Sequence, residues 1–396
     1  MINLSKFVAT AVATSVTMAL AACGGGGSGT NGSAGGSGST GTAYAASSLV
    51  SDKSAISAAH NDPNLVNPWG LVFAPGEAVW VANNGTQTST LYDGTGAAQG
   101  TFGVPGGTGG DPDPTGIVAN SSSDFAVTTS GKTAPALFIF DGEGGTLSGW
   151  APSVDAGSAV LAYDDGAING ASAAVYKGLA IASNGTANFL YATDFHNNKV
   201  DVFNAQFQKV TASGGFVDPT LPAGYAPFGI QAIANGVGGA AQIYVAYALQ
   251  DAAKHDNQNG AGLGLVDIYD ANGNLVKHLI PVGGALNAPW GITLAPSDFG
   301  PLSNTLLVGN FGDGLINAYD PATGAFVNNV HGADGTTFSS PGLWGIAFGN
   351  DAPGLDQPHN TLFYAAGTND ENDGTYGRID LSSAPASGGG GPPPPY

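Results

Sequence analysis

The residues of this chain that could do chemistry are aromatic rings and side-chain oxygens, and both recur at matching places in a repeated motif. The motif is a turn residue, a large side chain, a glycine and an aliphatic residue. An aromatic ring takes the large position in four copies, and such rings can stack on a sugar or another flat ligand. These ligand-binding candidates are Trp69, Phe228, Trp290 and Trp344. Packing between neighbouring repeats is the alternative that we favour, because a side chain present in every repeat commonly serves the fold.

Polar side chains follow the second apolar run of three repeats. Asn83, Asp194 and Asn310 lie at the ends of these runs, and His196 lies just beyond Asp194. Oxygens from separate repeats could coordinate Ca²⁺ together, since this ion takes six to eight oxygen ligands. We name Asp194 and His196 as catalytic candidates, and Asn83 and Asn310 as further ligand-binding candidates. Capping of the turns that follow these runs is the alternative.

Two loops are longer than their counterparts in the other repeats, and long loops on a rigid scaffold often carry function. They cover residues 250–262 and 368–374. The second has the character of a Ca²⁺ loop, without the full spacing of one, and a solvated loop is the alternative. The metal candidates, with Ca²⁺ as the expected ion, are Asp194, Asn310, Asp370 and Asp373.

The elements that must position these residues are short β-strands. After each motif glycine come β-rich runs bounded by glycine, asparagine and aspartate, which is the pattern of strands and hairpins. Four strands per unit, at a period of about 40–60 residues, predict the blades of a β-propeller. The sequence therefore predicts an all-β fold, a six-bladed β-propeller of four-stranded antiparallel blades. The six motif glycines are Gly70, Gly116, Gly178, Gly229, Gly291 and Gly345.

The expected strands also predict how the ring closes and where a ligand would bind. The last repeat ends before a fourth strand, so we expect residues 47–51, near Leu49, to pair beside residues 378–381 and remove an exposed edge. In the second repeat we expect the second strand at 125–128 and the third strand to end at Asp141. Loops that enter first strands and loops that follow second strands share one face of the blades, so they ring one mouth of the channel. Asp141 is then expected on the opposite face.

Two parts of the chain carry a resemblance to known families. The Tyr-Ala-Thr-Asp strand at 191–194, followed by Asn-Lys-Val-Asp-Val-Phe at 198–203, resembles the NHL-type propeller repeat. The opening at 65–71, together with 80–85, is similar to an uncharacterised family of bacterial exported propellers, conserved hypothetical lipoproteins. This resemblance implies the fold and no settled activity. Lactonase and gluconolactonase propellers, a related six-bladed class, bind Ca²⁺ through Glu, Asn and Asp, but this chain has no Glu at the expected place in blade one.

The N-terminus reads as a processing signal. Lys6 precedes an apolar stretch that is too short to span a bilayer, and Leu20-Ala21-Ala22-Cys23 resembles the lipobox of bacterial lipoproteins. We expect lipidation of Cys23, which would anchor the protein to a membrane. Gly24 favours the outer membrane, as the family resemblance implies for Gram-negative bacteria. The expected domains are a signal peptide at 1–22, the lipidated cysteine and a Gly/Ser tether at 23–43, the propeller at 44–383 and a Gly/Pro-rich tail at 384–396.

Charge and missing motifs limit the function classes. The formal net charge is −20, from 29 acidic and 9 basic residues, which argues against nucleic-acid binding and favours cationic partners. No nucleophile elbow, P-loop or His-Glu-x-x-His motif is present. We therefore predict a monomeric binding module for a small molecule, carbohydrate or protein, rather than an enzyme. The alternative is a Ca²⁺-dependent lactonase-like hydrolase or a lyase that acts at the channel mouth.

Overall fold

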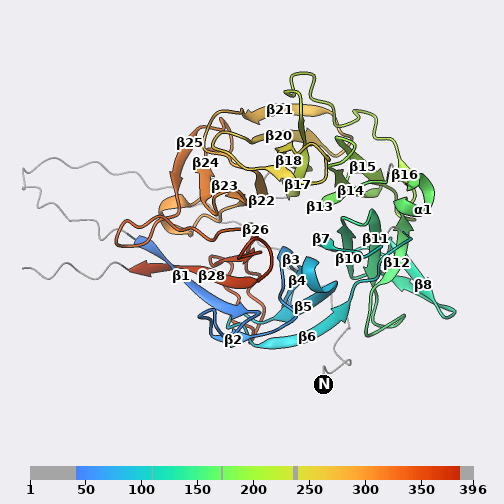
Figure 1. Ribbon diagram of the computed structural model, residues 1–396, viewed down its shortest axis with the longest axis horizontal. Helices are drawn as coiled ribbons and strands as arrows, with labels where there is room; N and C mark the ends of the chain where they lie inside the picture. Colours follow the sequence, from blue (N-terminus) through green and yellow to red (C-terminus); the bar gives the residue numbers. More distant parts are fainter. Residues whose placement is uncertain (1–41, 109, 171–172, 235–239, 384–396) are drawn as a thin grey trace, which may run out of the picture. The chain divides into compact units, whose positions relative to one another are not determined.

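The computed structural model describes residues 42–108, 110–170, 173–234 and 240–383 as six antiparallel β-sheets arranged around an axis (Figure 1). The first strands of the six sheets contact one another in a closed cycle, so they line the centre. The predicted six-bladed β-propeller is confirmed. The predictions for the leader, for Cys23 and for the tail from 384 onward lie outside the described residues.

Blades one, three and five are simple meanders, in which each strand pairs antiparallel with the next along the chain. From the axis outward, blade one has β3 (Pro68–Phe73), β4 (Val79–Asn83), β5 (Thr88–Tyr92) and β6 (Ala98–Gly103). Blade three has β13 (Tyr176–Ser183), β14 (Asn188–Asp194), β15 (Lys199–Phe203) and β16 (Lys209–Val210). Blade five has β22 (Pro289–Leu294), β23 (Leu306–Asn310), β24 (Ile316–Tyr319) and β25 (Phe326–Asn329).

Blade four has the same order with an addition in one loop. Its strands are β17 (Tyr225–Ala234), β18 (Ala241–Gln250), β20 (Leu265–Asp270) and β21 (Leu275–Ile280). The long loop after β18 carries β19 (Asn257–Gln258), which pairs with the end of β18. The expanded loop predicted at 250–262 is therefore partly held against its own blade.

Blade two departs from the predicted strand assignment. Its inner strand β7 (Pro114–Ala119) pairs with β10 (Phe138–Gly142), which is followed by β11 (Thr146–Trp150) and β12 (Val160–Asp164). The expected second strand lies instead in a separate hairpin of β8 (Ala126–Thr129) and β9 (Lys132–Pro135). Burial explains the difference, because a second strand is covered on both faces. All of β10 is buried, whereas β8 alternates between buried and exposed residues. The prediction that put Asp141 on the far face is therefore wrong: it lies near the mouth end of β10.

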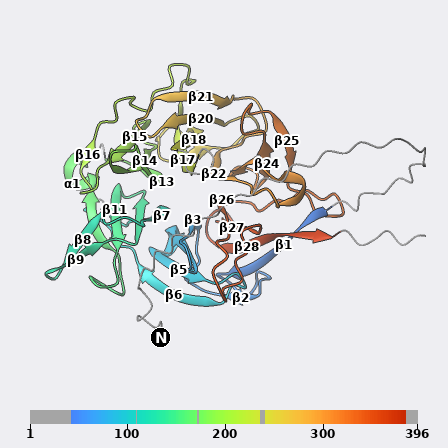
Figure 2. The ribbon, with the colours of Figure 1, turned by 180° about the vertical axis from the view of Figure 1, so that it is seen from behind.

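The ring closes as predicted, with the start of the chain completing the last blade. Blade six consists of β26 (Leu343–Phe348), β27 (Leu362–Ala366), β28 (Thr375–Ser383) and β1 (Thr42–Ser51), and β2 (His60–Asn61) pairs with β1. Ser47 lies opposite Arg378, and Ala46 lies opposite Ile379, in an antiparallel register. Figures 1 and 2 show β1 and β28 side by side.

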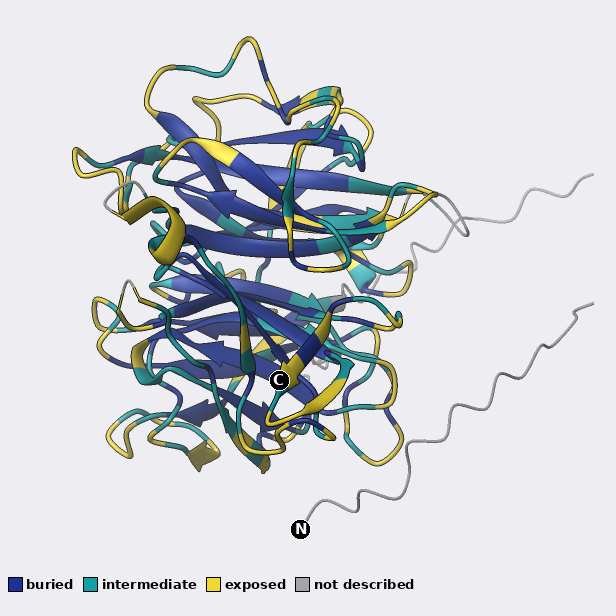
Figure 3. Ribbon diagram, turned by 90° about the vertical axis from the view of Figure 1, so that its right-hand side faces the viewer, coloured by how far each residue is buried: buried dark blue, intermediate teal, exposed yellow. Residues whose placement is uncertain are grey.

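Helices are few in the described ranges. They comprise α1 (Asp165–Asn169) and the short 3₁₀ segments η2 (Asn84–Thr86) and η4 (Gly300–Leu302). In this part of the chain, no helix has the length and apolar character needed to cross a membrane. The inner strands are mostly buried, whereas outer strands such as β6 and β25 and many of the loops are exposed, as Figure 3 shows.

The hydrophobic core is divided among the interfaces between blades. Each interface holds its own cluster of buried side chains: one, for example, joins Leu190 and Phe203 of blade three to Ile139 of blade two. A further cluster lies at the centre and gathers aromatic rings from several blades. Burial of apolar area between sheets is thus the main source of stability, since no blade covers its own faces.

The motif glycines explain how closely the inner strands approach. A Cβ atom built at Gly229 would overlap the carbonyl oxygen of Trp290 in the next blade, and one at Gly291 would lie 2.5 Å from the oxygen of Trp344. The same relation holds around the ring, with Gly178 the least crowded at 3.1 Å from the Phe228 oxygen. Glycine is needed here because each inner strand lies against the backbone of its neighbour.

Gly229→Ala should therefore destabilise the protein by about 3 kcal/mol, because the added methyl group forces two inner strands apart. Gly178→Ala is the matched control and should lower stability much less, since the Phe228 backbone needs to move by only a few tenths of an ångström to accept the methyl group. Denaturant unfolding of both variants measures the difference. Equal costs would show that the inner strands are not constrained by this approach.

Candidate functional site

The four aromatic side chains at the large position of the motif meet at the centre of the ring. The rings of Trp69 and Trp344 stack with centroids 3.4 Å apart, and Trp290 meets Trp69 edge-on at 5.8 Å. Phe228 lies 6.4 Å from Trp69 and 5.8 Å from Trp344. Phe311, from the loop after β23, stacks on Trp344 at 4.1 Å. These rings form an aromatic plug at the mouth end of the channel.

Hydrogen bonds fix the plug. The Trp344 Nε1–H donates to the Asn67 side-chain oxygen at 3.0 Å, and the Trp290 Nε1–H donates to the Lys177 carbonyl at 2.6 Å. Trp69, Phe228 and Trp344 are buried. Because the rings cover one another, the geometry gives them a packing role, and stacking of a ligand on them stays a prediction.

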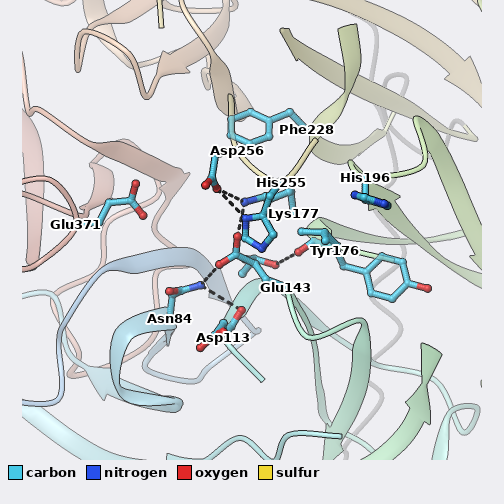
Figure 4. A network of polar contacts seen from close by, with 12 residues as sticks. Asn84, Asp113, Glu143, Tyr176, Lys177, His196, Phe228, His255, Asp256 and Glu371 are labelled. Atoms are coloured by element: carbon cyan, nitrogen blue, oxygen red, sulfur yellow. Dashed lines mark hydrogen bonds and ion pairs between the residues drawn. The ribbon is translucent and has the colours of Figure 1, made fainter. Parts of the chain in front are cut away.

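One motif position holds a lysine instead of an aromatic ring, and this lysine lies at the centre of the mouth. The Lys177 side chain is only 2% exposed, and its ammonium lies 5.3 Å from the centre of the Trp69 ring. It forms ion pairs with Glu143 and, at 3.2 Å, with Asp256 (Figure 4). Burial alone would lower the pKa of Lys177, but the attraction of Glu143 and Asp256 outweighs it and raises the pKa above the ordinary value.

The lysine is connected to a chain of hydrogen bonds that crosses blades. Asn84 donates to a Glu143 carboxylate oxygen at 2.8 Å and to the Asp113 carbonyl at 3.2 Å. Asn67 donates to the Asn84 side-chain oxygen at 3.2 Å and to Glu371 at 2.8 Å. Figure 4 shows Asn84 and Glu143 pointing toward each other below the lysine. The mouth is therefore one connected polar network above the aromatic plug.

Carboxylates outnumber positive charges in this network. Burial, and then repulsion from Glu143, raise the pKa of Asp113. Burial also raises the pKa of Glu371. The hydrogen bond from Asn67 lowers this pKa, and repulsion from Glu143 and Asp256 raises it further. These shifts show that the carboxylates lie close enough to repel one another, and that a further positive charge among them would be favourable.

A cavity of about 540 Å³ adjoins the network, which is within the range of small-molecule sites. Glu143, His196 and His255 line it. The His255 ring nitrogen Nδ1 lies 3.1 Å from Asp256, and this hydrogen bond raises the pKa of His255. His196, a predicted catalytic candidate, lies at the mouth, where its Nδ1 approaches the Lys254 carbonyl at 3.3 Å.

The structure does not join the other predicted oxygen donors to one another. Asp194 accepts from the Asn197 side chain at 2.8 Å and pairs with Lys199 at 3.4 Å. Asn83 donates to Thr88 and Thr90, and Asn310 donates to the Ala285 carbonyl at 2.9 Å. No contact links Asp194, Asn83 and Asn310 in the part of the chain that is described. Each stays within its own blade, and their roles in binding and metal coordination remain predictions.

The expanded loop at 368–374 contributes to the mouth through a residue that the sequence reasoning did not select. Glu371 reaches the network, while Asp373 pairs with Lys53 and accepts from Asn369 at 3.1 Å. Asp370 has a positive φ of 49° and no part in the network described above. Metal coordination by Asp370 and Asp373 remains untested.

Glu143 and Lys177 were missed for identifiable reasons. Glu143 follows β10, and the wrong second strand for blade two hid its place after a second strand. Lys177 gave a usable signal, because it is a lysine at a position that is aromatic in four other copies, in a chain with only 9 basic residues. Asp256 lies in an insertion, whose path over the mouth has no sequence signature.

The chain is similar in sequence to proteins of a giant virus. No family model matches it. An uncharacterised protein of Acanthamoeba polyphaga mimivirus is 33% identical over 344 residues, which cover 84% of this chain and 78% of that protein. A second uncharacterised mimivirus protein is 30% identical over 341 residues and is aligned over 84% of either chain. A third is 29% identical and is aligned over 74% of this chain and 53% of that protein.

Solved structures are similar in fold only. A protein of unknown function from Bacteroides thetaiotaomicron has a TM-score of 0.51 at 12% identity, over 86% of this chain and 76% of that one. Virginiamycin B lyase from Staphylococcus aureus has a TM-score of 0.45 at 12% identity, over 86% and 100% of the two chains. A putative gluconolactonase has a TM-score of 0.48 at 12% identity, over 80% and 89%.

These relatives correct two predictions. The predicted membership of a bacterial exported lipoprotein family is wrong, because the close relatives are proteins of a giant virus. The predicted location in a Gram-negative outer membrane is wrong for the same reason. Small residues before a cysteine at the end of a short apolar stretch therefore did not identify the source of the protein.

Replacement of Lys177 by methionine should cost about 3 kcal/mol of stability, because it leaves Glu143 in a buried site without its cation. Methionine keeps most of the side-chain volume, so the loss reports charge rather than packing. Lys132→Met, on the exposed strand β9, is the control and should change stability by less than about 0.5 kcal/mol. Denaturant unfolding measures both, and a small cost at Lys177 would contradict the ion-pair role.

Asp141 should give the protein a measurable pH dependence. Burial raises the pKa of its carboxyl to about 7, above the ordinary value of 3.8. The folded state therefore binds the proton more tightly than the unfolded state, and its stability falls as the pH rises from about 4 to about 7. Between pH 5 and pH 8 the wild type should lose stability on the order of 2 kcal/mol that Asp141→Asn does not lose.

The control for this experiment is Asp320→Asn. Hydrogen bonds from Thr323 lower the pKa of the exposed Asp320, so this group titrates below the range tested. Denaturant unfolding at the two pH values should show that this variant loses as much stability between them as the wild type does. If Asp141→Asn also loses as much stability as the wild type, another group causes the pH dependence.

Proposed function

The chain belongs to one family with the two mimivirus proteins that it matches over most of their length, and from this premise we propose that it is a binding propeller for positively charged groups. The binding site is the channel mouth. The ligand is a small amine, or a lysine or arginine side chain of a partner protein. The proposal assigns no catalytic step.

The excess of carboxylates around Lys177 is the observation that carries this proposal. Four carboxylates face the mouth network, those of Asp113, Glu143, Asp256 and Glu371, and Lys177 is the central ammonium. Glu143 and Asp256 are engaged by Lys177, whereas Glu371 is held only by the amide of Asn67 among the described contacts. Burial, and then repulsion from Glu143, raise the pKa of Glu371, and a cation beside its carboxylate would offset both effects.

The rest of the mouth suits binding because it is preorganised. The plug closes the channel below the network, so a ligand meets a floor of packed rings and fixed amides rather than an open tunnel. The network is braced by hydrogen bonds between blades, so little side-chain freedom is lost when a ligand binds. The overall charge of −20 adds a long-range attraction for cations.

An enzyme acting at the mouth is the second candidate, and one observation favours it. His255 is oriented by Asp256 on the wall of the cavity that Glu143 also lines, and such a pair can act as a general acid or base. Lactonase-like hydrolysis or a lyase reaction would use these groups. The predicted Ca²⁺ dependence has less support, since the ammonium of Lys177 already lies between Glu143 and Asp256.

Titration of the purified protein tests the binding proposal. Spermidine and a short peptide with three lysines should bind, with a change in tryptophan fluorescence, and affinity should fall as NaCl is raised to 0.5 M because exposed charges are screened. Glu371→Gln should weaken binding at least tenfold. Asp320→Asn removes one negative charge from the opposite face and should bind as the wild type does.

The neutral control for the peptide is the same sequence with its lysines acetylated, which should not bind. Equal binding of the acetylated peptide, or no effect of Glu371→Gln, would contradict the proposal. A panel of lactones and esters incubated with the same protein tests the second candidate. Turnover that is lost in His255→Ala would replace the binding proposal with an enzymatic one.

A further inference from the structure

A second cluster of ionisable side chains lies in the outer part of blade four, apart from the mouth network. Asp218 comes from the link that precedes β17, Asp267 from β20 and His278 from β21. The His278 Nδ1 atom lies 2.6 Å from an oxygen of Asp267 and 3.6 Å from one of Asp218. One ligand atom from each residue lies within 4.8 Å of the other two. Three separate segments therefore bring one donor each to a common point.

The two carboxylates are buried and their geometry is fixed. Both side chains have 0% exposure, while that of His278 is 35% exposed. Thr220 donates its backbone N–H and its hydroxyl to one oxygen of Asp218, both at 2.7 Å. Tyr269 donates to the second oxygen of Asp267 at 3.3 Å and is itself hydrogen-bonded to Tyr247. Each carboxylate thus has one oxygen held by the protein and the other directed toward His278.

One of these oxygens has no hydrogen-bond partner. The free oxygen of Asp218, Oδ2, is fully buried and is the atom that faces His278 Nδ1. A buried carboxylate oxygen without a donor is costly, because burial removes its water and nothing in the contacts replaces it. The atom needs a positive partner in the space beside His278.

Blade three shows what such a pair of carboxylates requires. Asp165, from the link before β13, and Asp201, on β15, are the equivalents of Asp218 and Asp267. The ammonium of Lys209, from the outer strand β16, bridges them at 2.8 and 2.7 Å. In blade four the outer strand supplies His278, which lies opposite Asp267 itself, whereas Lys209 lies opposite Phe203, two residues beyond Asp201. An imidazole nitrogen is a common metal ligand, so this pair of buried carboxylates has a third donor beside it where blade three has an ammonium.

We propose that Asp218, Asp267 and His278 bind a first-row divalent cation, of which Zn²⁺ is the best match. Two carboxylate oxygens, one imidazole nitrogen and a water molecule make a four-coordinate site, and imidazole selects Zn²⁺ over Ca²⁺ and Mg²⁺. In such a site the ligand atoms lie roughly 3.3 Å apart. The 2.6 and 3.6 Å separations at His278 Nδ1 lie on either side of this value.

The surroundings support a structural role for this ion. The hydrogen bonds from Thr220 and Tyr269 orient the two carboxylates, as hydrogen bonds to the ligands do in known metal sites. The partly exposed imidazole provides an entry path. The ion would attach the link between blades three and four to the body of blade four. The other cluster with metal-ligand spacing, Glu143 with His255 and Asp256, has its centre taken by the Lys177 ammonium.

Metal titration of the full-length protein after chelator treatment tests the proposal. Zn²⁺ should bind with one equivalent that survives desalting, as measured by elemental analysis, and should raise the thermal midpoint. Ca²⁺ should bind at least tenfold more weakly. Asp218→Asn should weaken Zn²⁺ binding at least tenfold, because it removes the free anionic oxygen.

His278→Lys is the decisive variant, because it supplies an ammonium to the two carboxylates, as Lys209 does in blade three. The ammonium should replace the metal, so the variant should stay folded, bind no Zn²⁺ at this site and show no Zn²⁺-dependent shift of the thermal midpoint. His255→Ala is the control for the mouth and should retain one equivalent. Absence of Zn²⁺ binding by the wild type, or a full equivalent retained by His278→Lys, would overturn the proposal.

Discussion

The close approach of the six inner strands determines most of what this protein can be. At each motif glycine, a strand lies against the backbone of the strand in the next blade, and at all of them except Gly178 a side chain would collide with it. This contact draws the blades inward and narrows the channel. The aromatic residues just before four of these glycines meet at the centre. Aromatic rings fill that space well, since they stack and meet edge-on at short distances.

A cation at one of these positions changes the character of the whole mouth. Lys177 is buried beside the Trp69 ring, and a buried ammonium is tolerated only with anionic partners. The loops after the second strands of blades two and four supply these partners, Glu143 and Asp256. Their carboxylates in turn attract the amides of Asn84 and Asn67, which extend the network to Glu371. One substitution in a repeated motif thus accounts for a polar surface that spans several blades.

The architecture could be predicted from the sequence because each copy of the motif marks the start of one inner strand, and therefore one blade. Six copies with the same succession of runs required like units in a ring, and the missing fourth strand required the segment near Leu49 to complete it. Blade two was misread because residues 125–128 and 138–142 are both apolar runs that form strands, and burial on both faces shows which of them is the second strand of the blade. The mouth network was beyond prediction, since it depends on which side chains meet across blades. Asp194, Asn83 and Asn310 shared a position in the repeat, but the structure keeps each of them within its own blade.

The pairing of β1 with β28 has a consequence for how the molecule is made. Ser47 and Arg378 lie opposite each other, although almost the whole folded chain separates them. During synthesis β1 has no partner strand until the ribosome has synthesised β28. Contacts of such long sequence separation form late and slow the search for the native state. Blades one to five can assemble as they emerge, whereas the final sheet becomes complete only after β28 has been synthesised.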